Sequence, residues 1–366
     1  MANNTDTIDL PNLPPLSHLT FSELHITEQD VEDQLKTMNI NKPAGPDCLH
    51  PIVIKNLSSS LTKPLTILFN KSLHMGVVPN AWKVANVKAL YKGKGDSSDP
   101  SNYRPIAITS CISKLLERIV FKYVFNFVHD HKIISNHQSG FQPNDSTINQ
   151  LLSIYHTIIS NLDKGKELRF VFCDISKAFD RVWHKGLLYK LESYGIKGSI
   201  LKWFESYLTD RQQSVTVEGF KSNLRSLNAG VPQGSVLGPF LFLLFINDIT
   251  NQISSNIKLF ADDTSLFVIV DDIDASTSIL NDDLESIHSW SRQWNINFNP
   301  DKTVSLKISR CNTTHPLLYF NDHPVAELTK HKHLGIIINS KGTWSDHIQY
   351  IYENLKRLQD LIFYVC

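Results

Sequence analysis

The sequence is poor in the features that mark secreted or disulfide-bonded proteins. Its 366 residues include five cysteines, an odd number, widely scattered along the chain. No two of them stand in the C-x-x-C spacing that begins many zinc sites. They are Cys48, Cys111, Cys173, Cys311 and Cys366. We interpret them as reduced thiols.

No segment is long and apolar enough to predict a membrane-spanning helix. The longest apolar stretch, residues 237–246, has about half of the roughly 20 residues that crossing a bilayer requires, and it contains Gly238 and Pro239. Residues 1–10 carry Asp6 and Asp9 but no Lys or Arg, unlike a secretory signal or a transit peptide. We therefore expect a protein that stays inside the cell and has no membrane partner.

What remains is the composition of an ordinary folded protein. Hydrophobic residues make up 42% and charged residues 20%, which excludes disordered, collagenous and coiled-coil chains. A chain of 366 residues is longer than one average domain. We expect two or three closely packed subdomains and a core large enough for an enzyme.

The formal net charge is zero, but the charges are unevenly distributed. Residues 1–34 carry seven acids and no Lys or Arg, residues 35–134 carry fourteen bases and five acids, and residues 231–301 carry two bases and ten acids. Basic segments beside an acidic block suit a protein that binds phosphates in one place and metal ions in another. The alternative is that these uneven charges simply lie on solvent-exposed faces of the protein and bind no ligand.

Periodicity and turn residues predict an α+β fold. Helices are expected from the capping box at Thr27 onward and at residues 57–74, 112–128, 187–207 (broken at Gly195 and Gly198) and 280–294. Strands are expected at residues 84–91, 170–173, 213–217, 224–228, 257–261, 264–270, 304–308 and 334–338. Helices and strands alternate irregularly, with probable hairpins, which argues against a parallel doubly wound sheet.

The segment Phe260-Ala261-Asp262-Asp263 lies between two β-prone runs. Adjacent carboxylates at a tight hairpin turn repel each other, and acids are normally depleted from strands, so a bound divalent cation would relieve the arrangement. A surface Asp-Asp turn is the alternative.

A second acidic segment, Asp174-Ile175-Ser176-Lys177-Ala178-Phe179-Asp180, follows a strand of buried type. A strand end that brings Asp174 beside Asp262 and Asp263 would gather three carboxylates in one cleft, as two Mg²⁺ ions require. By itself Asp174 can equally be a helix N-cap, and Asp180 is better explained as a structural residue than as a metal ligand.

These segments resemble polymerase motifs A, B and C of reverse transcriptases, specifically those of non-LTR (LINE-type) retrotransposons of the jockey and CR1 kind. Motif A matches residues 174–180, motif B matches AGVPQGSVLGP (residues 229–239), and motif C matches residues 260–263. Further matches, in order, are KPAGPD (42–47), NYRPI (102–106), SKLLE (113–117), QSGFQ (138–142), NPDKT (299–303) and HLG (333–335). They cover about 300 of the 366 residues.

The resemblance implies a right-hand polymerase with fingers and palm, in which an antiparallel palm sheet is packed against helices. It implies RNA-directed DNA synthesis from an RNA template, a DNA primer and deoxynucleoside triphosphates, with two Mg²⁺ ions for which Mn²⁺ can substitute. The ligands would be Asp174, Asp262, Asp263 and the backbone carbonyl of Ile175.

The resemblance also implies three nucleotide-binding residues in motifs A and B. Phe179 would be the steric gate that excludes a ribose 2′-hydroxyl, and its alternative is a core phenylalanine. Gln233 would contact the template base or the nucleotide. Gly234, which lacks a Cβ, would let the backbone approach a ligand closely. Residues 241–246 are expected to be the buried face of a following helix.

Cationic residues are expected at the phosphates. Arg104, with the lysines between Lys88 and Lys94, would meet the triphosphate, because a guanidinium binds phosphate oxygens bidentately. Lys302 matches the motif D lysine proposed as proton donor to pyrophosphate, and residues 333–335 resemble the primer grip. Solvated surface side chains remain the alternative for each cation, and a helix-cap lysine for Lys302.

The expected organisation is an N-terminal tail (1–26), fingers with the start of the palm (27–169), palm (170–310) and a motif E hairpin with the start of a thumb (311–366). The reverse transcriptase domain itself is expected at about 84–339. Cys48 stands where relatives usually have Gly, so that turn is expected to be distorted. We also expect a fragment that lacks the endonuclease and most of the thumb.

Two other functions are kept as alternatives. A decayed or co-opted copy would bind RNA or primer-template without synthesis, and a viral RNA-dependent RNA polymerase is disfavoured because Phe179 would crowd ribonucleotides. The expected location is the nucleus, a cytoplasmic ribonucleoprotein or both, and the oligomeric state is left open.

Overall fold

The computed structural model describes residues 10–13, 16, 18–93, 95–143, 145–217 and 219–365. The chain divides into two compact units, each assembled from three segments that are far apart in the sequence. Unit 1 comprises Met1–Ser135, Lys177–Asn247 and Gln293–Ile296, and unit 2 comprises Asn136–Ser176, Asp248–Arg292 and Asn297–Cys366. Each unit is described below by itself.

Residues 1–9, 14, 15 and 17 of the expected N-terminal tail lie outside the described residues. The described end of this segment is bound to unit 1. Phe21 forms a parallel bridge with Ile196, and the N–H of Lys197 donates to the carbonyl of Phe21 at 3.0 Å. The segment is therefore an extended arm that pairs with the loop after α6 (His184–Ser193).

Unit 1 contains a mixed sheet with the strand order β2-β1-β4-β5, in which β6 also pairs with β4. Its strands are β1 (Val84–Tyr91), β2 (Tyr103–Ile108), β4 (Arg211–Val217), β5 (Phe220–Lys221) and β6 (Arg225–Leu227). β1 is antiparallel to β2 and parallel to β4. Leu90 lies opposite Arg104, and Lys88 lies opposite Ile106. Because side chains alternate between the faces of a strand, Lys88 and Arg104 share one face.

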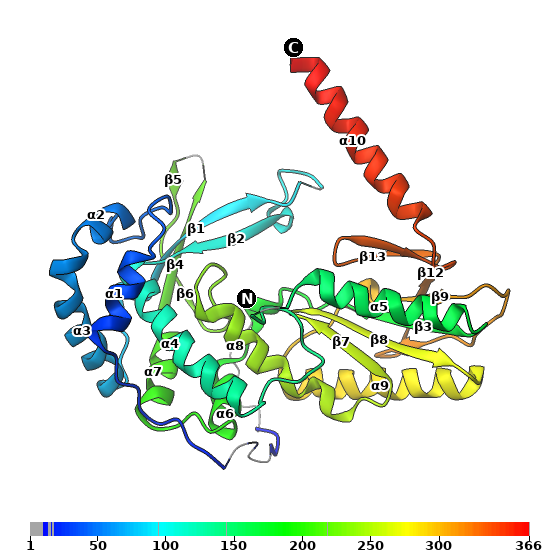
Figure 1. Ribbon diagram of the computed structural model, residues 1–366, viewed down its shortest axis with the longest axis horizontal. Coiled ribbons are helices and arrows are strands. Elements are labelled where there is room, and N and C mark those ends of the chain that lie inside the picture. The colour runs from blue at the N-terminus through cyan, green and yellow to red at the C-terminus, as the bar shows by residue number, and fades with distance from the viewer. Residues whose placement is uncertain are drawn as a thin grey trace. The chain divides into compact units, whose positions relative to one another are not determined.

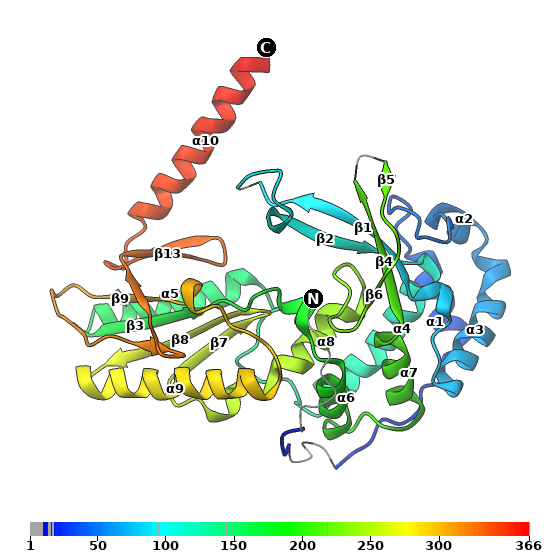
Figure 2. The same cartoon turned by 180° about the vertical axis from the view of Figure 1, so that it is seen from behind.

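The helices of unit 1 are α1 (Glu28–Lys36), α2 (Pro51–Asn56), α3 (Ser58–Met75), α4 (Cys111–Asp130), α6 (His184–Ser193), α7 (Gly198–Leu208) and α8 (Leu237–Ile246), with short turns η1 (Asn80–Trp82), η2 (Pro100–Asn102) and η3 (Ala178–Arg181). Figure 2 shows α1, α3, α4 and α7 clustered beside β4. In α8 every residue except Pro239 is buried. The prediction of a buried helix over residues 241–246 is confirmed.

The capping box predicted at Thr27 is present. The Thr27 hydroxyl accepts from the N–H of Asp30, and the Asp30 carboxylate accepts from the N–H of Thr27. Asp30 also accepts from Lys122 at 3.0 Å and from Tyr123 at 2.8 Å. These bonds outweigh the effect of burial and lower the pKa of Asp30 to about 2. The cap therefore also fastens α1 to α4.

Unit 2 is built on a sheet with the order β12-β9-β3-β8-β7. Its strands are β3 (Glu167–Cys173), β7 (Asn256–Phe260), β8 (Asp263–Val270), β9 (Val304–Ile308) and β12 (Ala326–Leu328). All neighbours are antiparallel except β12 and β9, which are parallel. Figure 1 shows α5 (Thr147–Leu162) and α9 (Ile273–Gln293) on opposite sides of this sheet.

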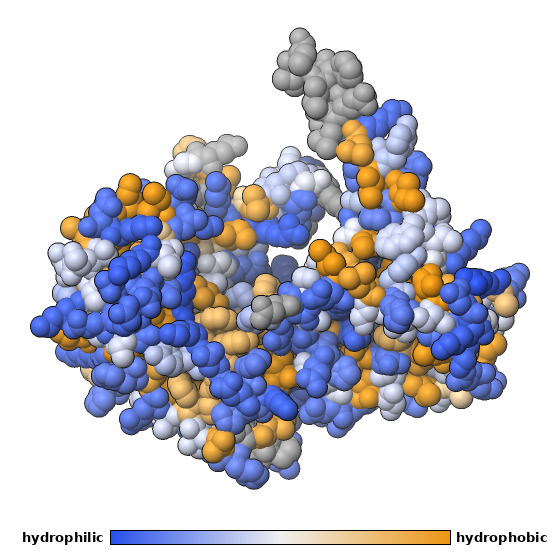
Figure 3. Space-filling model, in the orientation of Figure 1, coloured by the Kyte–Doolittle hydropathy of each residue, from blue (hydrophilic) through white to orange (hydrophobic). Residues whose placement is uncertain are grey.

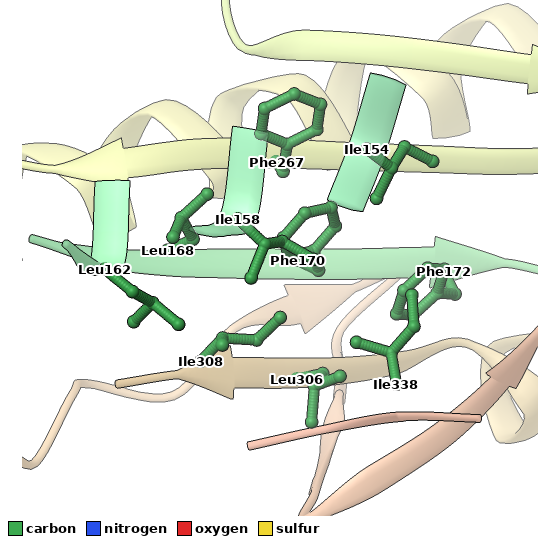
Figure 4. Close-up of a cluster of buried hydrophobic side chains, with 10 residues drawn as sticks. All are labelled: Ile154, Ile158, Leu162, Leu168, Phe170, Phe172, Phe267, Leu306, Ile308 and Ile338. Atoms are coloured by element: carbon green, nitrogen blue, oxygen red, sulfur yellow. The ribbon is translucent and has the colours of Figure 1, made fainter. Parts of the chain in front are cut away.

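One face of this sheet packs against α5 to form an apolar core. The side chains meet as Figure 4 shows, with Phe170 stacked on Phe267 at 4.8 Å between ring centroids. The cluster consists of Ile154, Ile158, Leu162, Leu168, Phe170, Phe172, Phe267, Leu306, Ile308 and Ile338. On the other face, Arg169 donates to Thr277 of α9 at 3.1 Å. Both faces of β3 are covered, which explains its almost continuous apolar sequence.

After β9 the chain forms small hairpins and a final helix. They are β10 (Tyr319–Phe320) with β11 (His323–Pro324), β13 (Lys330–His333) with β14 (Ile336–Asn339), and α10 (Ser345–Val365). Figure 3 shows hydrophobic side chains along α10. Four of them, Ile348, Ile351, Tyr352 and Leu355, are exposed and recur at helical spacing.

The predicted α+β class is confirmed, and most predicted elements are present. The helix expected at 280–294 begins earlier, at Ile273. The strand expected at 334–338 begins at Ile336, because Leu334 and Gly335 form the hairpin turn and both have positive φ. Helices α5 and α10 were not predicted. Among the described helices, none has the length and apolar character that crossing a membrane requires.

The four described cysteines are free thiols, as predicted. Cys48 has a φ of 57°, the left-handed conformation in which a side chain costs about 1 to 2 kcal/mol. The turn expected to be distorted therefore keeps the backbone that glycine favours, and Cys48 bears the strain.

Candidate active site

The acidic residues of unit 2 are brought together by strand pairing. Cys173, the last residue of β3, lies opposite Thr264 of β8. In the β7–β8 hairpin Phe260 lies opposite Asp263, so Ala261 and Asp262 form a two-residue turn. Asp174 therefore leaves β3 directly beside the start of β8. Asp174 thus meets Asp262 and Asp263, which follow it by 88 and 89 residues in the sequence, at one end of one sheet.

Burial and mutual repulsion both act on the carboxylates of this group. Burial, and then the negative charge of Asp174, raise the pKa of Asp262. Burial together with the charges of Asp262 and Asp174 raises the pKa of Asp263 to about 6. Mutual repulsion of this kind is relieved when a cation is bound between the carboxylates.

Lys302, which ends η5 (Pro300–Lys302), lies in the same place. Its Nζ is 3.4 Å from Oδ2 of Asp174, and both side chains are partly exposed. An ion pair with this much solvent contact is worth little stability. The geometry places the Lys302 amine beside the carboxylate group, and its role as proton donor to pyrophosphate stays a prediction.

Backbone hydrogen bonds to the segment 297–299 hold Asp174 and Ser176 in place. The N–H of Asn299 donates to the carbonyl of Asp174 at 2.8 Å, and the N–H of Ser176 donates to the carbonyl of Asn297 at 3.0 Å. These bonds flank the antiparallel bridge between Ile175 and Phe298 and use neither the N–H nor the carbonyl of Ile175. The carbonyl of Ile175 thus stays outside this ladder, as a ligand role would require.

The donor set fits a hard divalent cation. Carboxylate and carbonyl oxygens are the ligands that Mg²⁺ prefers, and a bound cation would offset the burial and the mutual repulsion that raise the pKa values of Asp262 and Asp263. Within the described part of the chain, no three His, Cys, Asp or Glu side chains already stand in ligating positions around one point. Instead, the charge beside Asp174 is supplied by Lys302.

Phe179, the motif A residue predicted to be the sugar gate, lies in η3 of unit 1. The ring of Phe179 stacks on Phe242 of α8, with centroids 4.9 Å apart, and it keeps part of its surface exposed. The carbonyl of Phe179 accepts from the N–H of Val231 at 2.8 Å. Motif A and motif B are therefore joined through their backbones within this unit.

Gln233 and Gly234 form a tight contact with β2. The N–H of Ala107 donates to the carbonyl of Gln233 at 2.6 Å. A Cβ on Gly234 would lie 2.5 Å from the carbonyl oxygen of Ala107, and the φ of Gly234 is +113°. The Gln233 amide nitrogen also donates to Asp180 at 3.3 Å. Only glycine permits this approach of the motif B loop to β2.

Arg104 and Lys88 are exposed on one face of the same β1–β2 hairpin. Gly234 packs on Ala107 of β2. Backbone contacts therefore join the motif B loop to β2, the strand that carries Arg104. Lys94, the last of the predicted lysines, lies outside the described residues.

One residue of functional interest was absent from the predicted site. Gln138 belongs to the QSGFQ segment, and its side chain is bound to the turn that carries Asp262. The recognisable signal was the segment itself, which was noted as a family match without a role for its glutamine.

Comparisons with known proteins agree with these features. The family described as "Reverse transcriptase (RNA-dependent DNA polymerase)" matches residues 92–343. The chain is 30% identical over 336 residues to "RNA-directed DNA polymerase from mobile element jockey" of Drosophila melanogaster, which covers 90% of this chain and 37% of that relative.

Two further relatives agree. The chain is 29% identical over 333 residues to "Probable RNA-directed DNA polymerase from transposon X-element" of Drosophila melanogaster, covering 89% of this chain and 36% of the relative. It is 28% identical over 253 residues to the "Retrovirus-related Pol polyprotein from type-1 retrotransposable element R2" of Popillia japonica, covering 65% and 34%. The chain thus spans little more than a third of the length of these curated relatives. By its family match and its similarity to these mobile-element proteins, the chain belongs to the reverse transcriptase (RNA-dependent DNA polymerase) family, in its non-LTR retrotransposon branch.

Proposed function

We propose that this chain is an RNA-directed DNA polymerase that extends the 3′ end of a DNA primer on an RNA template. Its substrates are deoxynucleoside triphosphates, and its cofactors are two Mg²⁺ ions, for which Mn²⁺ can substitute. The observation that carries the proposal is the meeting of Asp174, Asp262 and Asp263 at one end of a sheet, where burial and the neighbouring carboxylates raise the pKa values of Asp262 and Asp263.

In this proposal the three carboxylates and the carbonyl of Ile175 hold the metal ions. When bound, the ions lower the pKa of the primer hydroxyl and neutralise the charge that develops on the phosphates. The residues themselves perform no covalent step, since their role is to hold charge and position at the reacting groups. The two-residue turn fixes Asp262, and the backbone hydrogen bond from Asn299 fixes Asp174.

Lys302 is proposed to act as a proton donor near the leaving pyrophosphate. Its position supports this role, because its Nζ lies 3.4 Å from Oδ2 of Asp174, within the group of carboxylates proposed to hold the metal ions. The side chain of Lys302 is partly exposed, so its amine would be accessible to the phosphates of a nucleotide held by this group.

Unit 1 is proposed to recognise the nucleotide. Phe179 would exclude the ribose 2′-hydroxyl, and Arg104 would bind the triphosphate. Gln233 would contact the template base or the nucleotide, and Gly234 would let the backbone approach that ligand closely. The stacking of Phe179 on Phe242 supports the first role, because it holds the ring in one orientation while leaving part of it exposed.

We further propose that residues 27–169 act as fingers with the start of the palm, residues 170–310 as palm, and residues 311–366 as the motif E hairpin with the start of a thumb, after an N-terminal tail at 1–26. The reverse transcriptase domain would occupy about 84–339. A protein that copies RNA into DNA is expected in the nucleus, in a cytoplasmic ribonucleoprotein, or in both.

Primer extension tests the proposal. The chain is incubated with an oligo(dT) primer on a poly(rA) template, dTTP and Mg²⁺, and the products are resolved by length. We expect primer elongation that depends on the metal and on the RNA template. Binding of the primer-template without elongation in either Mg²⁺ or Mn²⁺ would overturn it and favour a co-opted nucleic-acid binding protein instead.

A further inference from the structure

In unit 2 a short segment before α5 pairs with β7, which is the edge strand of the sheet. The N–H of Leu259 donates to the carbonyl of His137 at 2.8 Å, and the N–H of Ser139 donates to the carbonyl of Leu259 at 2.9 Å. Gln138 therefore lies parallel to Leu259 as an added strand residue. This pairing brings Gln138 next to the turn between β7 and β8.

The side chain of Gln138 bonds to that turn. Its Oε1 accepts from the N–H of Ala261 at 3.0 Å and from the N–H of Gly140 at 2.8 Å. Gln138 is only 6% exposed, so water cannot readily replace these bonds, and a buried donor that loses its acceptor is costly. The Nε2 atom is buried and has no hydrogen-bond partner among the described residues.

The contact at Gly140 is equally close. A Cβ on Gly140 would lie 2.2 Å from the nitrogen of Ala261 and 2.8 Å from the carbonyl carbon of Phe260. A side chain at this position would push the segment away from the turn. Gly140 is thus required for Gln138 to reach Ala261.

Ala261 needs such support. Its φ is 56°, a conformation that costs a residue other than glycine about 1 to 3 kcal/mol and persists only where the surroundings enforce it. Asp262 follows directly, so the backbone of Ala261 determines where that carboxylate points.

We propose that Gln138 is a positioning residue for the carboxylate turn: by accepting the N–H of Ala261 it holds Asp262 and Asp263 in the orientation that binds metal ions. This inference rests on the proposed polymerase function for the identity of the ligand, and on geometry alone for the contact. Gln138 itself touches no substrate.

The test compares Gln138→Met with Gln150→Met. Both positions are buried glutamines of unit 2, at 6% and 3% exposure, but neither side-chain atom of Gln150 has a hydrogen-bond partner among the described residues. Replacement of a glutamine by methionine removes the acceptor and keeps most of the volume. The Gln150 variant therefore controls for general effects of the substitution.

Three readouts are measured on the whole chain: hydrogen exchange of the peptide containing Ala261, affinity for Mn²⁺ alone by electron paramagnetic resonance, and kcat and KM for dTTP. In Gln138→Met we expect faster exchange at Ala261, Mn²⁺ affinity lower by about 10-fold to 100-fold, and kcat reduced by a similar factor with KM nearly unchanged. Gln150→Met should leave all of them as they are. Gln138→Glu, which keeps an acceptor oxygen, should restore the slow exchange.

A slow exchange of the Ala261 amide is also expected in the unaltered chain, so the inference remains testable if Gln138→Met does not fold. Fast exchange there, or unchanged Mn²⁺ affinity in a folded Gln138→Met, would overturn it. The proposed function fails separately: it is wrong if Asp262→Asn binds Mn²⁺ and extends primers normally, whatever happens at Gln138.

Discussion

In unit 2 the carboxylates project from a strand end and a hairpin turn, and the core that supports those strands lies elsewhere, between the sheet and α5. In unit 1, by contrast, the proposed nucleotide-binding residues are themselves part of the packing. Phe179 stacks on Phe242, and Gly234 lies against the backbone of β2. The two units hold their functional residues by different means.

The difference determines how function and stability are related in each unit. Removing a carboxylate from unit 2 deletes charge without opening a cavity. Removing Phe179 or adding a side chain to Gly234 changes the packing of unit 1 as well as the site. Substitutions in unit 2 should therefore separate activity from stability, and substitutions in unit 1 should not.

The largest effect is expected for Asp262→Asn. Several kcal/mol of charge stabilisation in the transition state are lost when a metal ligand is removed, so synthesis should fall by about 1000-fold or more. The pKa of Asp262 is raised in the fold, so loss of its charge should leave the melting temperature unchanged or slightly higher at neutral pH. Primer extension and thermal melts measure both.

The matched control is Asp271→Asn, at the opposite end of β8, where the exposed carboxylate pairs with Lys166. It should leave synthesis intact. Equal loss of synthesis in both variants would mean that the effect of Asp262→Asn is not specific to the carboxylate turn.

Gly234→Ala should impair unit 1 in both respects. A Cβ would meet the carbonyl oxygen of Ala107 at 2.5 Å in a backbone of positive φ, which predicts a loss of about 2 to 4 kcal/mol in the free energy of unfolding and poor nucleotide use. Gly219→Ala is the control, because its φ is also positive but a Cβ there meets nothing within 4 Å. Similar losses in the two variants would show that the contact with β2 is unimportant.

Phe179→Val tests the sugar gate. If the ring excludes the 2′-hydroxyl, the ratio of ribonucleotide to deoxyribonucleotide kcat/KM should rise about 10-fold to 100-fold, with some loss of stability because the stack on Phe242 is removed. Phe204→Val, at a fully buried position of unit 1, should lower the melting temperature without changing the ratio. An unchanged ratio in Phe179→Val would assign this ring to the core alone.

The two units should also differ in acid sensitivity. Burial and the neighbouring His331 lower the pKa of His333 in unit 2 to about 4, so its contribution to stability is full above pH 6.5 and is lost as the pH falls toward 4. The loss is about 1 kcal/mol by pH 5.5. In unit 1 the pKa of Asp30 is lowered, so the stability that its carboxylate contributes is lost only at lower pH, as the pH falls from about 3.8 toward 2.

Chemical unfolding between pH 7 and 5 measures this effect. His333→Gln should remove the His333 contribution, which is obtained as the difference from the unaltered chain because Asp263, with its pKa raised to about 6, acts in the opposite direction over the same pH range. If the dependence is the same in His333→Gln, another group is responsible.

The smallest effects are expected at two residues, Cys48 and Ala261, whose backbone has a positive φ. Cys48→Gly relieves strain in a turn of unit 1 and should raise the free energy of unfolding by about 0.5 to 1 kcal/mol with synthesis unchanged. Ala261→Gly relieves similar strain in unit 2 but loosens the turn that carries Asp262, so synthesis should fall. Melts and primer extension compare them, and unimpaired synthesis in Ala261→Gly would mean that Asp262 needs no rigid turn.

Much of this fold was predictable because its signals are local. The capping box at Thr27, the buried α8 and the hairpin around Asp262 each depend on residues that are neighbours in the chain. The start of β14 was misplaced because Leu334 adopts a positive φ in the turn, which a branched apolar residue does not signal. Helix α5 was missed because its apolar pattern is blurred: Gln150 is buried in the same row as Ile154, Ile158 and Leu162, whereas the apolar Ile148 and Leu152 are exposed.

The sequence by itself determined which residues carry the chemistry, because the types of these residues and their order in the motifs are read directly from it. They are carboxylates, a glutamine and glycines. Only the tertiary structure decided how they are held. The pairing of β3 with β8 joins Asp174 to Asp263, and an added strand places Gln138 on the turn at Ala261. Such contacts join residues about 90 to 120 positions apart. They depend on strand register and on buried hydrogen bonds, and no local pattern encodes either.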